Sequence, residues 1–160
     1  MILLILLALL LAFGLWRWFR FTLCNLFYIA THLGKVRKGK QRLAIFMYYA
    51  VDLLAFDTWI ADVFKYKGDK FDYAEWPLVF AMKRWYGDCD AVASLAWKWA
   101  ERNGYPAKYV SIKRVNLVGH AVCLVKVDGK WNMVDSTGIV DFTGWATHYP
   151  NCKIIVRKTR

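Results

Sequence analysis

The pattern of hydrophobic and polar positions divides this chain into an apolar N-terminal run, a basic block and a mixed remainder. Residues 1–16 contain no charged side chain, and residues 16–20 (Trp-Arg-Trp-Phe-Arg) have the composition of an interfacial belt at a membrane surface. Sixteen residues are short of the roughly 20 that cross a bilayer. A span therefore either covers about residues 2–20 or belongs to one helix that runs to about residue 31. We predict an N-terminal transmembrane helix within a membrane anchor over residues 1–34.

A cleaved signal peptide is the alternative to a retained anchor. No Lys or Arg precedes the apolar run, and no small-x-small cleavage site follows it, so the sequence favours the anchor. Residues 1–42 hold seven basic and no acidic residues, and all seven follow the apolar run. The positive-inside rule then predicts a single-pass membrane protein whose remaining chain lies in the cytoplasm.

The basic block over residues 35–42 is predicted to be a juxtamembrane linker. It holds five positive charges in eight positions, which fits a solvated linker and equally fits adhesion to anionic lipid headgroups. Residues 43–64 are apolar but include Asp52, Asp57 and Asp62, which argue against a second span. We expect one or two amphipathic helices there, packed on the domain or lying at the membrane interface.

Residues 43–160 are predicted to form one α+β domain. The motif Gly87-Asp88 opens a helical pattern whose apolar positions recur at i, i+3, i+4 and i+7, and Asn103-Gly104 ends it. Asp128-Gly129 is a strong signal for a two-residue hairpin turn. A short helix over residues 75–85 precedes the motif, and strands are expected over residues 108–113, 120–127, 130–137 and 152–157. Helices followed by antiparallel strands indicate the α+β class.

Charge and cysteine content narrow the functional classes. The formal net charge is +11, and residues 1–42 supply +7 of it, so a membrane surface explains the charge better than a nucleic acid does. No nucleic-acid-binding motif accompanies the basic residues. The four cysteines form no CxxC pair, which argues against a structural zinc site. We expect no metal and no cofactor, and the cytoplasmic topology favours free thiols.

Cys89 is the candidate nucleophile. It falls in the first turn of the predicted helix, where free backbone N–H groups and the helix dipole favour a thiolate and can stabilise an oxyanion. The neighbouring carboxylates of Asp88 and Asp90 oppose thiolate formation, so a nearby imidazolium is needed. A buried, inert cysteine is the alternative.

The predicted hairpin supplies the partners. If Val127 pairs with Lys130, then His120 and Asp135 are diagonal neighbours on one face of the sheet, within reach of an imidazole–carboxylate hydrogen bond. The same count puts Cys123 on the opposite face, as a core residue rather than a metal ligand. Candidate substrate-binding residues beside the cysteine are Trp85, Tyr86 and Asp88, although both aromatic residues also fit a core role.

Four short motifs in this order resemble the transglutaminase-like (bacterial transglutaminase-like cysteine peptidase) superfamily. They are Gly87-Asp88-Cys89-Asp90, Gly104-Tyr105-Pro106-Ala107, His120-Ala121-Val122 with Val125-Lys126-Val127, and Trp131-Asn132-Met133-Val134-Asp135-Ser136. The resemblance covers roughly residues 74–137. The Cys-to-His spacing is short for the family, and an N-terminal membrane anchor is a departure from it.

The resemblance implies a papain-like α+β core with Cys89 as nucleophile, His120 as general base and acid, and Asp135 as the orienting group. It also implies a thioester formed from a peptide or amide substrate and passed to water or to an amine. Partners are then a peptide or amide substrate and the lipids that contact the anchor and the basic block. The alternatives are a catalytically inactive relative that serves as a membrane-bound interaction module, and a membrane-disrupting protein that acts through residues 1–64.

Overall fold

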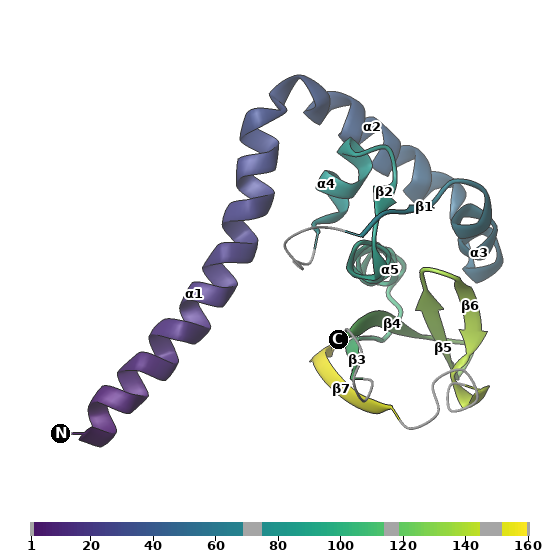
Figure 1. Ribbon diagram of the computed structural model, residues 1–160. Coiled ribbons are helices and arrows are strands. Elements are labelled where there is room, and N and C mark those ends of the chain that lie inside the picture. The colour runs from purple at the N-terminus through teal and green to yellow at the C-terminus, as the bar shows by residue number, and fades with distance from the viewer. Residues whose placement is uncertain (1, 69–74, 114–118, 145–151, 160) are drawn as a thin grey trace.

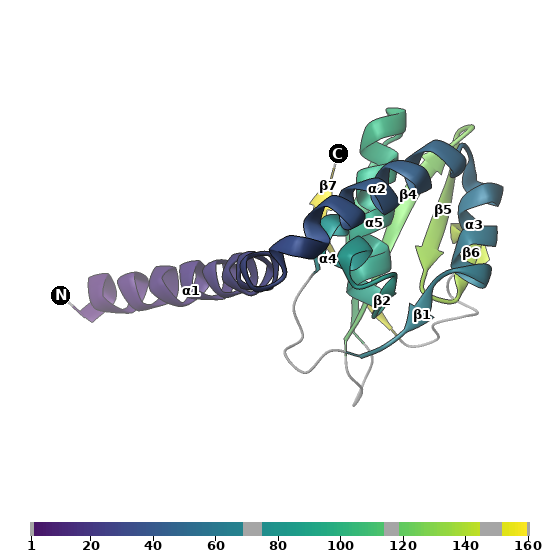
Figure 2. The ribbon, with the colours of Figure 1, turned by 90° about the horizontal axis from the view of Figure 1, so that it is seen from above.

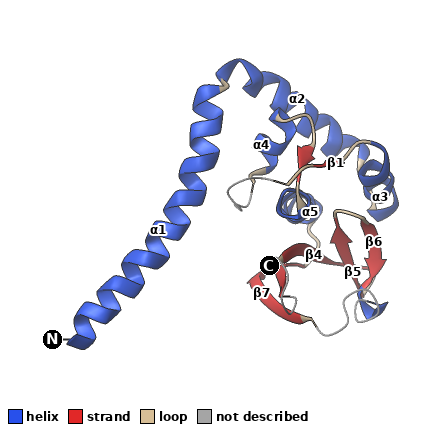
Figure 3. Ribbon diagram, viewed as in Figure 1, coloured by secondary structure: helices blue, strands red, loops and turns tan. Residues whose placement is uncertain are grey.

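A computed structural model describes the backbone of residues 2–68, 75–113, 119–144 and 152–159. Helices lie on one side of the molecule and the main sheet on the other, and the N-terminal helix projects away from both (Figures 1 and 3). This arrangement confirms the α+β class. The helices are α1 (Ile2–Thr31), α2 (Leu33–Tyr49), α3 (Leu53–Asp62), α4 (Pro77–Met82), α5 (Cys89–Asn103) and the 3-10 helix η1 (Phe142–Gly144). The strands are β1 (Lys65–Tyr66), β2 (Tyr86–Gly87), β3 (Ala107–Lys113), β4 (His120–Val127), β5 (Lys130–Asp135), β6 (Gly138–Asp141) and β7 (Lys153–Thr159).

Helix α1 runs without interruption to Thr31, the longer of the two expected lengths. Its C-terminal part is fixed to the domain, because the buried side chain of Asn25 accepts a hydrogen bond from the backbone N–H of Trp76 at 2.9 Å. The rest extends away to one side, as the view from above shows (Figure 2). In the part of the chain that the structure describes, no helix is long and apolar enough to cross a membrane. The side chains of residues 1–14, on which the predicted anchor depends, lie outside the described residues, so the anchor stays a prediction.

The basic block over residues 35–42 is helical, and its role as a juxtamembrane linker stays a prediction. It forms the first half of α2, which continues to Tyr49. Lys, Arg and Gln are good helix formers and no proline interrupts them, so the local preference of this block is helical. After a short turn, α3 begins at the N-cap Asp52, whose side chain accepts from the backbone N–H of Ala55 at 2.8 Å.

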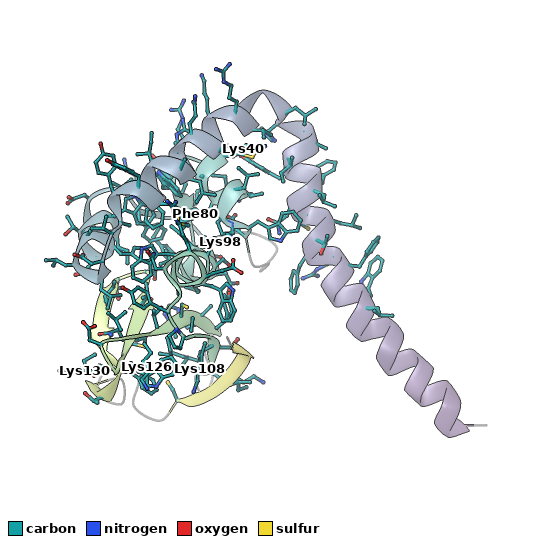
Figure 4. The ribbon with its side chains drawn as sticks, turned by 180° about the vertical axis from the view of Figure 1, so that it is seen from behind. Lys40, Phe80, Lys98, Lys108, Lys126 and Lys130 are labelled. Atoms are coloured by element: carbon teal, nitrogen blue, oxygen red, sulfur yellow. The ribbon has the colours of Figure 1, made fainter. Side chains whose placement is uncertain are left out.

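The core lies on both sides of α5. One side of this helix packs on the sheet, and the other packs under α2, α3 and α4, where Phe80 lies in the interior (Figure 4). The indole N–H of Trp99 donates to the carbonyl of Ala50 and so joins α5 to the end of α2. Aromatic rings fill the space between the helices, mostly in edge-to-face pairs, an arrangement that their quadrupoles favour. The rings belong to Phe46, Phe56, Trp59, Phe80, Trp85 and Trp99.

The main sheet has five antiparallel strands in the order β6-β5-β4-β3-β7. The predicted hairpin is confirmed: Val127 pairs with Lys130 and Cys123 with Val134. Its turn residues Asp128 and Gly129 have φ angles of 50° and 79°, which fit a two-residue hairpin turn with both residues in the left-handed region. The sequence analysis missed β6 and the short parallel pair β1–β2. Both are too short to show a periodic pattern.

Gly39 marks a close approach of α2 to α4, and we predict that Gly39→Ala destabilises the fold. A Cβ at this position would lie 2.5 Å from Cγ and 3.3 Å from the backbone N of Met82, so α2 and α4 must separate. We expect a loss of about 1–3 kcal/mol in the free energy of unfolding, measured by chemical denaturation.

Gly34→Ala is the matched control in the same helix. A Cβ there meets no atom within 4 Å, so the substitution should leave stability unchanged or raise it by up to about 1 kcal/mol. If the two substitutions changed the free energy of unfolding equally, the close approach of α2 to α4 at Gly39 would be contradicted.

Candidate active site

The motif around Cys89 is held in place by backbone geometry. Asp88 is the N-cap of α5, and its carboxylate accepts from the backbone N–H groups of Asp90 at 3.1 Å and Ala91 at 3.4 Å. A Cβ on Gly87 would lie 2.7 Å from that of Ala91 and 3.0 Å from the ring of Phe80. The backbone at Gly87 therefore packs directly on the core just before α5 begins. Cys89 is the first residue of the helix.

The sulfur of Cys89 faces the start of β4. The backbone N–H of Ala121 points at Sγ across 3.5 Å. Cys89 is partly exposed and packs against the main core cluster. Cys89 thus lies at a helix N-terminus and also receives a backbone N–H from a second element.

His120 and Asp135 form the hydrogen-bonded pair that the hairpin register predicted. His120 Nε2 lies 2.9 Å from Asp135 Oδ1, and the carboxylate is 4% exposed. The same oxygen accepts from the backbone N–H of Ser136 and from its hydroxyl at 3.0 Å. The imidazole also has a hydrogen bond with Cys89. Because Nε2 is bound to Asp135, Nδ1 is the ring nitrogen that is left to serve the sulfur.

The pKa of His120 is raised from 6.5 to about 9. Burial acts against this shift, since it disfavours the charged ring. Hydrogen bonds to Asp135 and Cys89, together with the negative charges of both groups, outweigh burial and favour the imidazolium. At neutral pH the ring therefore carries the positive charge that the sequence analysis required beside Cys89.

The end of the strand brings His120 to the sulfur. Strict alternation would place His120 with Val122 and Leu124, which belong to a core cluster on the sheet face away from α5. His120 is the first residue of β4 and Asp135 is the last of β5. His120 and Asp135 thus lie at the ends of their strands, beside the start of α5. From this position the ring of His120 contacts Cys89.

Trp85 packs in the core, and its assignment to substrate binding stays a prediction. It is 7% exposed, and its ring centroid lies 5.0 Å from that of Trp59 and 5.3 Å from that of Phe80. Tyr86 is 40% exposed, with the ammonium of Lys65 at 5.6 Å from the ring centroid. Asp88 caps α5, as described above. A role in substrate binding stays a prediction for Tyr86 and Asp88.

Cys123 is separate from this site. Cys123 is buried on the α5 side of the sheet, and burial raises the pKa of its thiol. All four cysteines are free thiols. Among the described residues, no group of three or more His, Cys, Asp or Glu side chains could hold a metal ion. His148 lies outside the described residues.

Sequence reasoning missed two contacts that support the site. The hydroxyl of Tyr109 donates to Asp90 at 2.7 Å, and the carboxylate of Asp57 accepts from the backbone N–H of Ile139 at 2.7 Å. The second contact joins α3 to β6, the strand that pairs with the end of β5 at Asp135. Each contact joins elements far apart in the sequence, so no local pattern predicts it.

Comparison of the sequence with protein-family models gives no match. Comparison with curated proteins gives no match either. Among solved structures, the chain is similar to one described as "a Putative Cysteine Protease from Cytophaga hutchinsonii", with 16% sequence identity and a TM-score of 0.49. The alignment covers 79% of this chain and 51% of that chain, so this chain spans about half the length of that protein.

The raised pKa of His120 predicts that stability falls at alkaline pH. The folded state holds the proton more tightly than the unfolded chain, whose histidine has a pKa near 6.5. The contribution to stability is complete below about pH 6.5 and is lost as the pH rises through about 9, by up to about 3 kcal/mol.

Urea denaturation at a series of pH values would measure this loss. His120→Gln should flatten the dependence between pH 6.5 and 9, whereas His32→Gln, at the junction of α1 and α2, should leave it intact. An unchanged slope in His120→Gln would contradict the assignment.

Proposed function

We propose that this protein is a cysteine enzyme that transfers acyl groups from a peptide or amide substrate to water or to an amine. One observation carries the proposal: Cys89, His120 and Asp135 form a hydrogen-bonded chain whose sulfur lies at the N-terminus of α5. Nucleophile, base and orienting carboxylate in this order define a catalytic triad by geometry and role. In this proposal, α5 and the antiparallel sheet are a papain-like core.

The first step forms a thioester. The thiolate of Cys89 attacks the carbonyl carbon of the scissile amide, and the carbonyl oxygen takes the negative charge. Backbone N–H groups at the start of α5 are the donors for this oxyanion. The protonated ring of His120 then gives its Nδ1 proton to the leaving nitrogen, the C–N bond breaks, and the amine departs.

The second step releases the acyl group. His120, now neutral, takes a proton from water or from an acceptor amine, which attacks the thioester carbonyl. Collapse of the tetrahedral intermediate breaks the C–S bond, and the thiolate of Cys89 returns beside the imidazolium. Asp135 stays ionised throughout and holds Nε2–H, so the ring keeps Nδ1 toward the reacting atoms.

Acylation by p-nitrophenyl acetate tests the nucleophile. Full-length protein should form one acetyl adduct on Cys89, detected by intact mass and peptide mapping, and Cys89→Ala should abolish it. Cys123→Ala is the matched control: its thiol is buried, so adduct formation should continue unchanged. Equal acylation of wild type and Cys89→Ala would overturn the proposal.

Asp135→Asn tests whether the carboxylate orients the ring of His120, in a variant that should still fold. The amide is nearly isosteric with the carboxylate but carries no charge, so we expect acylation to slow by about 10²–10⁴-fold. The pKa of His120, followed by NMR, should fall from about 9 toward its ordinary value. Asp141→Asn, at an exposed carboxylate on β6, is the control and should change neither quantity.

Loss of the cysteine or of the histidine distinguishes an enzyme from a catalytically inactive relative. If Cys89→Ala and His120→Ala keep the full biological activity of the protein, the fold serves as an interaction module and the enzymatic proposal is wrong.

A further inference from the structure

We propose that Tyr109 is a positioning residue that holds the carboxylate of Asp90 on the sheet and so allows the thiolate of Cys89 to form. This inference rests on the proposed function, since it concerns the same sulfur. Tyr109 touches neither the substrate nor the reacting atoms in this proposal and acts only through Asp90.

The Tyr109 hydroxyl joins two turns of α5 to β3. It donates to Asp90 Oδ1 at 2.7 Å and also has a hydrogen bond with the hydroxyl of Ser94. Asp90 and Ser94 are four residues apart and therefore lie one above the other on the same face of the helix. The tyrosine thus bridges consecutive turns at the end of the helix that carries Cys89.

The tyrosine is itself fixed within the sheet. Its backbone pairs with Cys123 of β4 on one side and with Lys158 of β7 on the other, so β3 is not an edge strand at this position. Burial, followed by the charge and hydrogen bond of Asp90, raises the pKa of Tyr109 well above 10.0. The phenol therefore remains protonated, and remains a donor, over the pH range in which a cysteine titrates.

Asp90 needs such an anchor because its charge opposes the chemistry. A carboxylate in the first turn stabilises the helix dipole, but one that is adjacent in sequence to Cys89 disfavours a thiolate. The sulfur faces β4, where the N–H of Ala121 meets it, whereas the Asp90 carboxylate is bound on β3. The titratable groups described around the sulfur are Asp88 and Asp90 on α5, Tyr109 on β3, His120 on β4 and, through the imidazole, Asp135 on β5.

A double-mutant cycle with a pH profile tests the proposal. The rate of Cys89 alkylation by iodoacetamide is measured against pH in the full-length protein, with peptide-resolved mass spectrometry to separate the four cysteines. Tyr109→Phe releases the carboxylate and should move the midpoint of the profile up by about one pH unit. Asp90→Asn removes the opposing charge and should move the midpoint down by a similar amount. Tyr109→Phe added to Asp90→Asn should cause no further shift.

Tyr105→Phe is the matched control, because its ring packs on Trp99 toward the far end of α5. It should leave the midpoint unchanged. Melting temperatures of all variants are recorded, so that a purely structural role is visible as a loss of stability without a shift of the midpoint.

The outcomes separate the two proposals. A Tyr109→Phe shift of equal size with and without the Asp90 carboxylate, or no shift at all, overturns the positioning role and leaves the enzymatic proposal standing. If Cys89 of the wild type reacts no faster than the same cysteine in urea-unfolded protein, and if His120→Ala does not change its rate, the enzymatic proposal fails and the positioning role fails with it.

Discussion

The packing of α5 between the helices and the sheet is the constraint on which the rest of this structure depends. Both sides of the helix are buried, so neither rotation nor translation is possible without exposing apolar surface, at about 25 cal/mol per Å². A helix held in this way places its first residue as firmly as its middle. Cys89 therefore meets the start of β4 at a fixed distance, although it lies at the end of an element. The fully buried residues of α5 are Ala91, Val92, Ala93, Leu95, Ala96, Trp99 and Ala100.

Polar interactions then decide what the cysteine can do. The helix start holds two carboxylates beside a candidate thiolate, and the structure assigns each a partner: Asp88 caps the backbone, and Asp90 accepts from Tyr109. The positive charge comes from His120, which is hydrogen-bonded to Asp135, and Ser136 donates to the same carboxylate oxygen. In a partly buried site, hydrogen bonds of this kind polarise one another, and an unsatisfied member would be costly. The carboxylates of the two aspartates that flank the cysteine thus each have a hydrogen-bond partner in the fold.

The helical layer also explains why so many aromatic residues occur before the motif. Phe46, Phe56, Trp59 and Trp85 fill the space above α5, and Gly39 lets α2 approach α4 closely enough to cover it. Lys40 of α2 lies on the outside of this layer, at the opposite end of the molecule from Lys108, Lys126 and Lys130 of the sheet (Figure 4). Arg42 is turned inward, and its guanidinium donates to the carbonyl of Ala81 at 3.1 Å and so joins α2 to α4.

The sequence by itself determined the α+β class, the start and end of α5, and the hairpin register that brings His120 to Asp135. These features depend on short-range rules: helix periodicity, an Asp N-cap, a glycine at the helix end with φ of 72°, and a two-residue turn. Only the tertiary structure decided that Trp85 belongs to the core and that His120 contacts the sulfur around the end of a strand. It alone paired Asp90 with Tyr109 and Asp57 with Ile139. The physical reason is that periodicity and turn chemistry constrain neighbours along the chain, whereas these contacts depend on how rigid elements pack against one another.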